Sequence, residues 1–485
     1  MIMAEEQRFL KARQVFEQLL AFVSQAGEQD LRIDLFERET LAMLLKVGFE
    51  LVEGHIARCG DGNAGETLEE NGRTLRRSDK PHDRRYVSIF GEHLFERYVY
   101  ALRAGQKIEG MPVDERLGLP EGDFSYVLQD WLQRFTLKES FAEATTSLET
   151  LLGLRISVRS AEHMNQHVAE ATEEYRTAQP PPDLKEEAEL LVYANDCKGV
   201  PMRRPVEERA RRGSRRGKGE KANQKQMACV GAAYSVAPYV RTADDILDEL
   251  FREARAADRP RPQNKRLWAE MTYAREGEPL NGKTRVFAQQ ALDLKARDPT
   301  RKKTVLCLMD GEKALRQEQH EWLPRAIGIL DIWHVIERLW GVAYCFHAEQ
   351  SLAAEQFVEG RLRALLEGKV GYVIGYFRRL LQQTDLSTAK RRTIHSAITY
   401  FDNHRPYMKY DEYLAAGYPI GSGVAEGACR HVVKDRMELT GMRWTVQGAQ
   451  SMLHLRAIYL NDDWDSFLET YIETEQSQLY RKNAA

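Results

Sequence analysis

Four short apolar runs in the middle of the chain constrain its fold more than any other feature. Each is shorter than a typical helix and uniformly apolar, as is usual for a strand buried on both faces. The runs are ELLVYAND (189–196), QMACVGAAYSV (226–236), TVLCLMD (304–310) and AIGILD (326–331). Two helical stretches separate the second run from the third, and the first stretch begins at Thr242 with capping-box spacing. This order of strands and helices predicts an α/β sheet.

The part of the chain before this sheet is predicted to be helical, with one β-hairpin. Residues 1–57 have apolar positions at helical spacing, which predicts two helices. Residues 58–177 start with a polar, glycine-containing linker up to residue 85 and continue with a hairpin that turns at Gly91 and Glu92. Three consecutive prolines at 180–182 then break the helical pattern, and we place the main domain boundary there.

The predicted sheet domain is divided in sequence by a helical segment. It comprises residues 184–334 and 416–445, and the intervening residues 335–415 have a helical pattern without any strand signal. Residues 446–485 are predicted to form C-terminal helices. The expected fold class is therefore multidomain: an α-helical N-terminal region with a β-hairpin, then an α/β domain with an all-helical insertion.

The segment SFAEATTSLETLLGLRISVRSAEHMNQHVAEA has the spacing of a helix-turn-helix, with a turn at Gly153 and a second helix from near Ser157. In such a motif the second helix lies in the major groove of DNA and its polar side chains contact base edges. The candidates for this role are Arg159, His163, Asn165 and Gln166. An ordinary helical hairpin within a bundle is the alternative.

Aspartates end two of the predicted strands, at Asp196 and Asp310. The carboxyl ends of strands in an α/β sheet line the crevice where ligands bind. Two carboxylates held close repel each other unless a hard cation such as Mg²⁺ lies between them. Either aspartate alone is equally compatible with a turn or a helix cap.

A third carboxylate is expected, and Glu426 is the best candidate because the glycines of PIGSG (419–423) allow its helix to approach the sheet. Arg430 follows at i+4 on the same helical stripe, so it is a candidate for holding a phosphate oxygen. A solvated glutamate at a helix start is the alternative for Glu426.

The segment 203–226 is strongly basic, with seven arginines and three lysines against three glutamates. Its glycines predict a flexible loop suited to contacting phosphates without reading sequence. Arg216, Lys218 and Lys221 are the candidate contacts, and a merely solvated charge run is the alternative.

Other motifs narrow the chemistry. His334 follows the fourth strand after Asp331 and is expected either to face the crevice or to be structural. No HExxH, GxxxxGK[ST] or GxGxxG pattern is present, so the spacing predicts no zinc, ATP or NAD site. The six cysteines form no CxxC pair and are expected to be structural thiols.

Composition limits the function classes further. The net charge of the 485 residues is −3, so any strong charge must be local. No apolar run approaches the ~20 residues of a spanning helix. The N-terminus lacks the pattern of a signal peptide, and a cytoplasmic location without membrane partners is expected.

Seven stretches together resemble the transposases of the Kra-type bacterial insertion sequences, within the Mutator-like group. They are DCKGVPMRRP, EKANQKQMACVGAAYSV, PRPQNKRLWAEM, CLMDGEKAL, ILDIWHVIERLW, YPIGSGVAEGACRHVVKDRMELTGMRW and LHLRAIYLNDDW. The resemblance covers about residues 85–470. It implies a ribonuclease H-like catalytic domain with a helical insertion, a catalytic and metal-binding triad of Asp196, Asp310 and Glu426, and an Asp-x-x-His signature at Asp331 and His334.

The implied activity is DNA cleavage and strand transfer by two-metal phosphoryl transfer, with two Mg²⁺ ions for which Mn²⁺ can substitute. The implied partners are the terminal inverted repeats, the target DNA and at least one further copy of the chain, in the bacterial nucleoid. Two other functions stay open, a catalytically silent DNA-binding relative and a metal-dependent nuclease without strand transfer. A purely structural scaffold would leave the three carboxylates and the basic segment unexplained.

Overall fold

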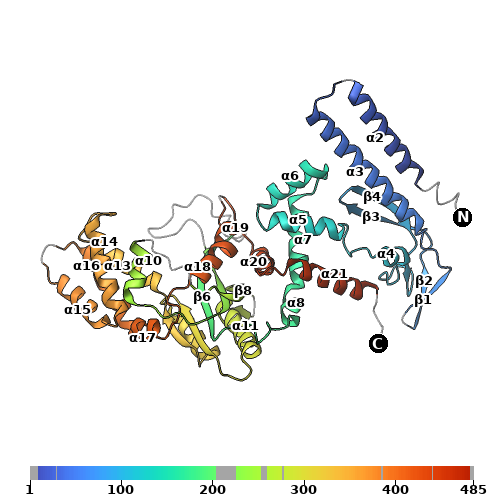
Figure 1. Ribbon diagram of the computed structural model, residues 1–485. Coiled ribbons are helices and arrows are strands. Elements are labelled where there is room, and N and C mark those ends of the chain that lie inside the picture. The colour runs from blue at the N-terminus through green and yellow to red at the C-terminus, as the bar shows by residue number, and fades with distance from the viewer. Residues whose placement is uncertain are drawn as a thin grey trace, which may run out of the picture. The chain divides into compact units, whose positions relative to one another are not determined.

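The chain folds into two compact units in the computed structural model (Figure 1). The first unit comprises residues 1–175 and 464–485, and the second comprises residues 176–463. The structure describes residues 9–28, 30–70, 72–203, 225–252, 259–275, 278–383, 386–439 and 441–480.

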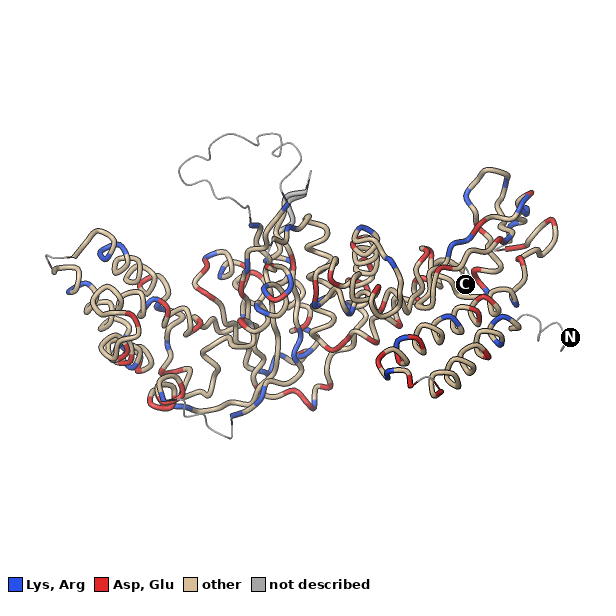
Figure 2. Tube along the Cα trace, turned by 90° about the horizontal axis from the view of Figure 1, so that it is seen from above, with Lys and Arg blue, Asp and Glu red and all other residues tan. Residues whose placement is uncertain are grey.

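Two long helices open the first unit, α2 (Leu10–Glu28) and α3 (Ile33–Arg58), as the helical spacing of residues 1–57 predicted. They pack against each other, and charged residues of both signs are interspersed along them (Figure 2). The predicted hairpin is also present. Strands β3 (His82–Ser88) and β4 (Gly91–Arg97) pair antiparallel around the turn at Gly91.

The segment predicted as a linker instead contains strands. A three-stranded sheet of order β1-β2-β5 is formed by β1 (Thr67–Glu70), β2 (Arg73–Arg77) and β5 (Tyr100–Ala101). Within β1 and β2 only Leu75 is fully buried, so these strands lack the apolar alternation by which half-buried strands are recognised.

Helices complete the first unit: α4 (Pro112–Leu117), α5 (Tyr126–Thr136), α6 (Phe141–Leu152), α7 (Val158–Glu170) and α21 (Trp464–Tyr480). Helix α8 (Thr172–Ala178) begins in the first unit and ends in the second. Ser140 and Glu143 form a capping box at the start of α6, and Gly153 ends this helix in the left-handed conformation. The Ser157 hydroxyl accepts the Ser160 N–H at 3.0 Å and caps α7. The helix, turn and helix therefore lie where local signals predicted them.

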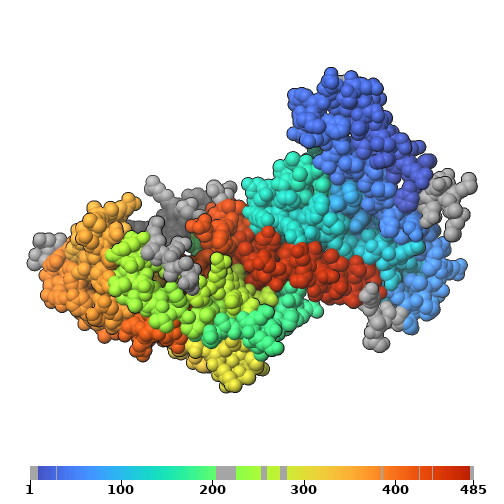
Figure 3. Space-filling view, viewed as in Figure 1, coloured from blue at the N-terminus to red at the C-terminus, as the bar shows by residue number. Residues whose placement is uncertain are grey.

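Helix α21 joins this unit from the far end of the sequence (Figure 3). The Tyr471 hydroxyl donates to Gln129 Oε1 at 3.1 Å, and Gln476 Nε2 donates to the Gly118 carbonyl at 3.0 Å. The sequence predicted one C-terminal helical region over 446–485, but its two helices belong to different units, since α20 (Val446–Leu460) lies in the second.

A mixed five-stranded sheet forms the centre of the second unit, with strand order β12-β11-β6-β7-β8. Strands β12 (Ile327–Leu330), β11 (Thr304–Met309) and β6 (Leu190–Pro201) are parallel to one another. Strand β7 (Lys225–Val236) is antiparallel to β6, and β8 (Gln263–Met271) is antiparallel to β7. All four predicted strands are present.

Strand β8 was missed by the sequence reasoning, which expected only helices between β7 and β11. Helices α10 (Ala243–Phe251) and α11 (Gly282–Arg297) do lie there, but β8 and the short pair β9 (Tyr273–Arg275) and β10 (Glu278–Leu280) lie between them. The first half of β8, residues 263–266, is polar and partly exposed. It therefore lacks the apolar pattern from which a strand is predicted.

The two faces of the sheet pack against different helices. Leu190, Val192 and Ala194 of β6 belong to the core that includes the helical insertion, whereas Leu191 and Tyr193 belong to the core formed with α11 and α12 (Lys313–Trp322). The segment after β12 is helical, as predicted: α13 (Ile332–Ala343), α14 (Leu352–Leu366), α15 (Val370–Leu380), α16 (Thr388–His404), the 3₁₀ helix η1 (Arg405–Tyr407) and α17 (Tyr410–Ala415).

The chain then returns to the sheet through α18 (Gly423–Ala428), the π-helix η2 (Cys429–Lys434) and α19 (Asp435–Met437), which form one continuous helical segment. Helix α18 contacts β6 and β7. Among the described residues, none of the helices combines the length and hydrophobicity needed to span a bilayer.

Candidate active site

Asp196 and Asp310 lie side by side on the central strands. Met309 of β11 is paired with Asn195 of β6, so each aspartate comes one residue after a paired position on neighbouring parallel strands, whose axes are about 4.8 Å apart. Side chains alternate along a strand, so Asp196 lies on the same face as Val192 and Ala194. Strand β6 continues along β7 to Pro201, so Asp196 ends only the part of β6 that pairs with β11.

Both carboxylates accept a hydrogen bond from a nearby backbone N–H. Asp196 Oδ1 accepts the Cys197 N–H at 2.7 Å, and Asp310 Oδ1 accepts the Glu312 N–H at 2.7 Å. Both residues are half-buried. The backbone bonds restrict the two side chains. The Cys429 thiol is a further neighbour of Asp196: burial, and then the Asp196 carboxylate that it contacts, raise the pKa of Cys429.

Glu426 lies on α18, and the Glu426 N–H donates to the Ser422 carbonyl at 2.9 Å at the start of this helix. Partial burial raises the pKa of Glu426, and the nearby carboxylates of Asp331 and Asp196 raise it further, whereas His334 lowers it. The negative charge of Asp196 is therefore close enough to act on Glu426. Of the predicted triad, Glu426 and Asp196 are thus neighbours, and Asp310 follows the strand that pairs with β6.

Asp331 fixes the segment that carries Glu426. It is fully buried, and its Oδ1 accepts the Trp333 N–H at 2.9 Å as the N-cap of α13. Its Oδ2 accepts the Ser422 N–H at 3.1 Å and the Ser422 hydroxyl. The Ile332 N–H also donates to the Ile420 carbonyl at 3.0 Å. Asp331 thus joins the end of β12 to the glycine-containing segment 419–423, which we call the hinge. It is a positioning residue for the helix that carries Glu426.

His334 lies one turn into α13, half-buried, with its Nδ1 3.4 Å from Glu337. His334 lowers the pKa of Glu426 and is therefore near that carboxylate, and the expectation that it faces the crevice stays a prediction.

The helical insertion also approaches the site, through residues that the sequence reasoning missed. His404 of α16 lies with Nε2 2.9 Å from the Gly311 carbonyl, and the centroids of the Tyr400 and His404 rings are 4.5 Å apart. A Cβ on Gly311 would meet Tyr400 at 2.5 Å, so only glycine allows this approach. Burial, and then the charge of Asp310, raise the pKa of Tyr400 to about 12. No local signal marks Tyr400 or His404, because tertiary packing brings them to the strand end.

Arg430 does not lie where the helical stripe predicted. A π-helix begins at Cys429, and its wider turn changes the direction of every later side chain relative to α-helical spacing. The Arg430 side chain is 71% exposed and lies 3.6 Å from Asp435. Arg430 is therefore exposed on a helical segment whose spacing differs from the predicted one, and its role as a phosphate contact stays a prediction.

The residues proposed to read DNA have different environments. Arg159 and His163 on α7 are exposed, and Gln166 is half-buried. Asn165 is 1% exposed and donates through Nδ2 to Gln133 Oε1 at 2.8 Å, so it is a core residue and is withdrawn as a base contact. A polar residue in a helix is usually expected at the surface, so nothing in the sequence indicated that Asn165 and Gln133 form a buried pair.

The candidate phosphate contacts of the basic segment, Arg216, Lys218 and Lys221, lie outside the described residues. Of the described residues at the two ends of this segment, the Arg203 N–H donates to the Trp444 carbonyl at 2.7 Å, and the Lys225 ammonium lies 2.7 Å from Glu438.

The carboxylates fit a hard divalent cation by their chemistry. Asp196, Asp310 and Glu426 offer only oxygen donors, the type that Mg²⁺ binds, and the raised pKa of Glu426 reflects burial and uncompensated negative charge around it. The three are not drawn tightly together. Among the described residues, ligand atoms within 4.8 Å of one another occur in only one group of three, Glu121, His167 and Glu475 in the other unit.

Comparison with known proteins adds no assignment: neither a protein-family model nor a curated protein matches this chain.

Proposed function

We propose that this chain is a DNA transposase of the Kra-type insertion-sequence group, which cleaves and joins DNA at a ribonuclease H-like site. The observation that carries the proposal is the placement of three carboxylates. Asp196 and Asp310 are neighbours on parallel strands, and α18 brings Glu426 within charge interaction of Asp196. The segment between the second and third carboxylates is largely helical and ends at the hinge that Asp331 holds.

The sheet supports the ribonuclease H-like part of the proposal. Three antiparallel strands, β6, β7 and β8, are followed in sequence by β11 and β12, which extend the sheet beside β6 and run parallel to it. The acidic residues lie on the first and fourth strands of this series and on the returning helix, all on or against one face.

The residues of this site would act by holding and orienting charge. Asp196, Asp310 and Glu426 would hold two Mg²⁺ ions, which would supply activation of the attacking oxygen and stabilisation of the leaving 3′ oxygen. Asp331 keeps Ser422 and hence the Glu426 helix in place. His334 lies near Glu426 and lowers the pKa of that carboxyl. No side chain is required as a covalent nucleophile.

The DNA-binding part of the proposal involves the basic segment and α7. Arg216, Lys218 and Lys221 would neutralise phosphates near the carboxylates, since their segment connects β6 to β7. Arg159, His163 and Gln166 remain candidates for base contacts, as α7 presents them at least partly to solvent.

We further propose that the active form contains at least two copies, because two element ends must be brought together. The first unit offers an apolar surface for this contact. Phe16, Leu41 and Leu44 on α2 and α3 are 45–49% exposed. Light scattering of the Leu41→Glu, Leu44→Glu double variant should show a smaller particle than the wild type if this surface joins the copies.

The decisive experiment is cleavage and strand transfer on a labelled duplex that carries the inverted repeat flanking the locus, with Mg²⁺. The wild type is compared with Glu426→Gln and Asp310→Asn, and Glu412→Gln serves as the control because Glu412 is an exposed glutamate of α17. We expect the wild type and the control to cut and join, and the two site variants to bind DNA without cutting.

Each other outcome identifies a different function. Cleavage without joining by the wild type would indicate a nuclease. Binding without cleavage by every protein would indicate a silent DNA-binding relative. Full cleavage by the Asp310→Asn variant would refute the assignment of the triad.

A further inference from the structure

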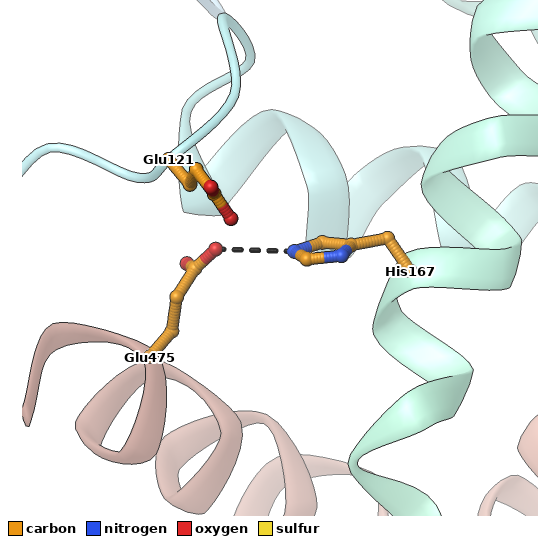
Figure 4. A group of neighbouring side chains, drawn as sticks. All are labelled: Glu121, His167 and Glu475. Carbon is orange, nitrogen blue, oxygen red and sulfur yellow. Dashed lines mark hydrogen bonds and ion pairs between the residues drawn. The ribbon is translucent and has the colours of Figure 1, made fainter. Parts of the chain in front are cut away.

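A histidine and two glutamates converge in the first unit, far from the carboxylates of the second in sequence. Glu121 lies in the loop before α5, His167 lies in the last turn of α7, and Glu475 lies on α21. Figure 4 shows their polar ends directed toward one another. One ligand atom from each residue lies within 4.8 Å of the other two, and His167 Nε2 is 3.1 Å from Glu475 Oε1.

The buried member of this cluster is not fully satisfied. Glu475 is 8% exposed, and its second carboxylate oxygen, Oε2, makes no hydrogen bond of normal geometry, although the Tyr126 hydroxyl lies close enough for Glu475 to raise the pKa of Tyr126. A buried carboxylate oxygen without a partner is costly, because its hydration is lost and nothing replaces it. His167 contacts one oxygen of Glu475 and the Tyr126 hydroxyl is a neighbouring donor, so Glu475 offers a buried carboxylate beside two other potential ligands.

The charged groups around His167 are acidic. The charged groups that act on it are Glu475, Glu170 and Glu121, all acidic. A single imidazolium does not balance three carboxylates. Glu121 is exposed, so the cluster has an open side through which a cation can enter.

The donor set identifies the class of cation. One imidazole nitrogen and two carboxylate oxygens are typical ligands of Zn²⁺ and related divalent transition metals, with water in a fourth position. Nδ1 of His167 lies 3.7 Å from Glu170 Oε2, so a second carboxylate faces the ring nitrogen that the metal would not use. Carboxylates placed in this way orient metal-bound histidines.

We propose that Glu121, His167 and Glu475 form a binding site for a divalent transition metal, with Zn²⁺ as the best-matched ion. Its ligands belong to a loop, to the second helix of the helix-turn-helix and to the C-terminal helix. Metal binding therefore fastens α21 to α7. This site is independent of the proposed transposase chemistry, since it shares no residue with it.

The test uses the full chain, stripped with a chelator and then equilibrated with Zn²⁺ alone. Bound zinc is measured by elemental analysis after gel filtration, and thermal unfolding is recorded with and without Zn²⁺. The variants are His167→Gln, which removes the nitrogen ligand, and Glu121→Gln, which changes an exposed residue and leaves the pair of His167 and Glu475 intact. The controls are His82→Gln and Glu162→Gln, an exposed histidine and an exposed glutamate of the same unit.

We expect the wild type and both controls to bind one equivalent of zinc more than either site variant, and to unfold several degrees higher when Zn²⁺ is present. The Glu121→Gln variant should remain folded without metal and show at least tenfold weaker zinc binding. Equal zinc content and equal thermal shifts in the wild type, His167→Gln and Glu121→Gln would overturn the proposal and leave His167 and Glu475 as a simple ion pair.

Discussion

Replacing Asp331 by alanine should destabilise the second unit and release the hinge that carries Glu426. The side chain is fully buried and accepts three hydrogen bonds, from the Trp333 N–H, the Ser422 N–H and the Ser422 hydroxyl. Loss of an N-cap costs about 1 kcal/mol. Leaving the Ser422 donors buried without an acceptor costs about 1–3 kcal/mol more, because Ser422 is itself only 4% exposed.

One effect opposes this loss. Burial raises the pKa of Asp331 despite its hydrogen bonds, so the native state bears a cost for the buried charge that alanine would relieve. We therefore expect a net loss in the lower part of the summed range, about 2–3 kcal/mol in the free energy of unfolding. Asparagine should be intermediate, since its single carbonyl oxygen cannot accept from both Trp333 and Ser422 while its NH₂ group only donates.

The assay is urea denaturation followed by tryptophan fluorescence, combined with hydrogen exchange of the peptide that contains Ser422 and Glu426. Ser387→Ala is the matched control because Ser387 caps α16 at an exposed position and accepts only the Lys390 N–H, at 3.3 Å. The control should lose about 1 kcal/mol or less and leave exchange at the hinge unchanged. If Asp331→Ala lost no more stability than the control, with no faster exchange at the hinge, Asp331 would be a simple helix cap and our account of the hinge would be wrong.

Three further predictions concern other parts of the molecule. Burial would raise the pKa of Glu270, but neighbouring His454 and arginines lower it to about 2, so its contribution to stability is present above pH 4.5 and is lost as the pH falls toward 2. Unfolding free energies should fall by roughly 3 kcal/mol more over this range in the wild type than in Glu270→Gln; parallel curves would contradict this. Gly231→Ala should lower the urea midpoint by the equivalent of about 1–3 kcal/mol, because its Cβ would meet Val286 Cγ1 at 2.4 Å; an unchanged midpoint would show that β7 and α11 separate easily. Changing Lys218 and Lys221 to alanine should reduce the log-log salt dependence of DNA affinity by about one unit for each phosphate that the protein no longer neutralises, and an unaltered slope would place that segment away from DNA.

Elements with strong local signals were predicted well from the sequence. The four apolar runs became β6, β7, β11 and β12, because a strand buried on both faces requires apolar residues throughout. Helix ends such as those at Ser157 and Thr242 were also predictable, since capping depends on residues within one turn. Strands with a polar half, such as β8, escaped detection because only their packed half carries a hydrophobic pattern.

Side-chain directions were predictable only where the backbone stayed regular. Asp196 and Asp310 each come one residue after the last pair of the regular β6–β11 ladder, as predicted, whereas the π-helix that begins at Cys429 interrupts the α-helical spacing from which the position of Arg430 was predicted. Asn165 lies in the core because it forms a hydrogen bond there with Gln133 of α5.

The sequence by itself therefore determined the strands, the helix ends and the acidic residues at the ends of the parallel ladder, all of which depend on neighbours a few residues away. Only the tertiary structure decided how Asp331 holds the hinge, how Tyr400 and His404 reach Gly311, and how Glu121, His167 and Glu475 meet. These arrangements join residues that are distant in the chain, and their geometry follows from the packing of whole elements rather than from any local pattern.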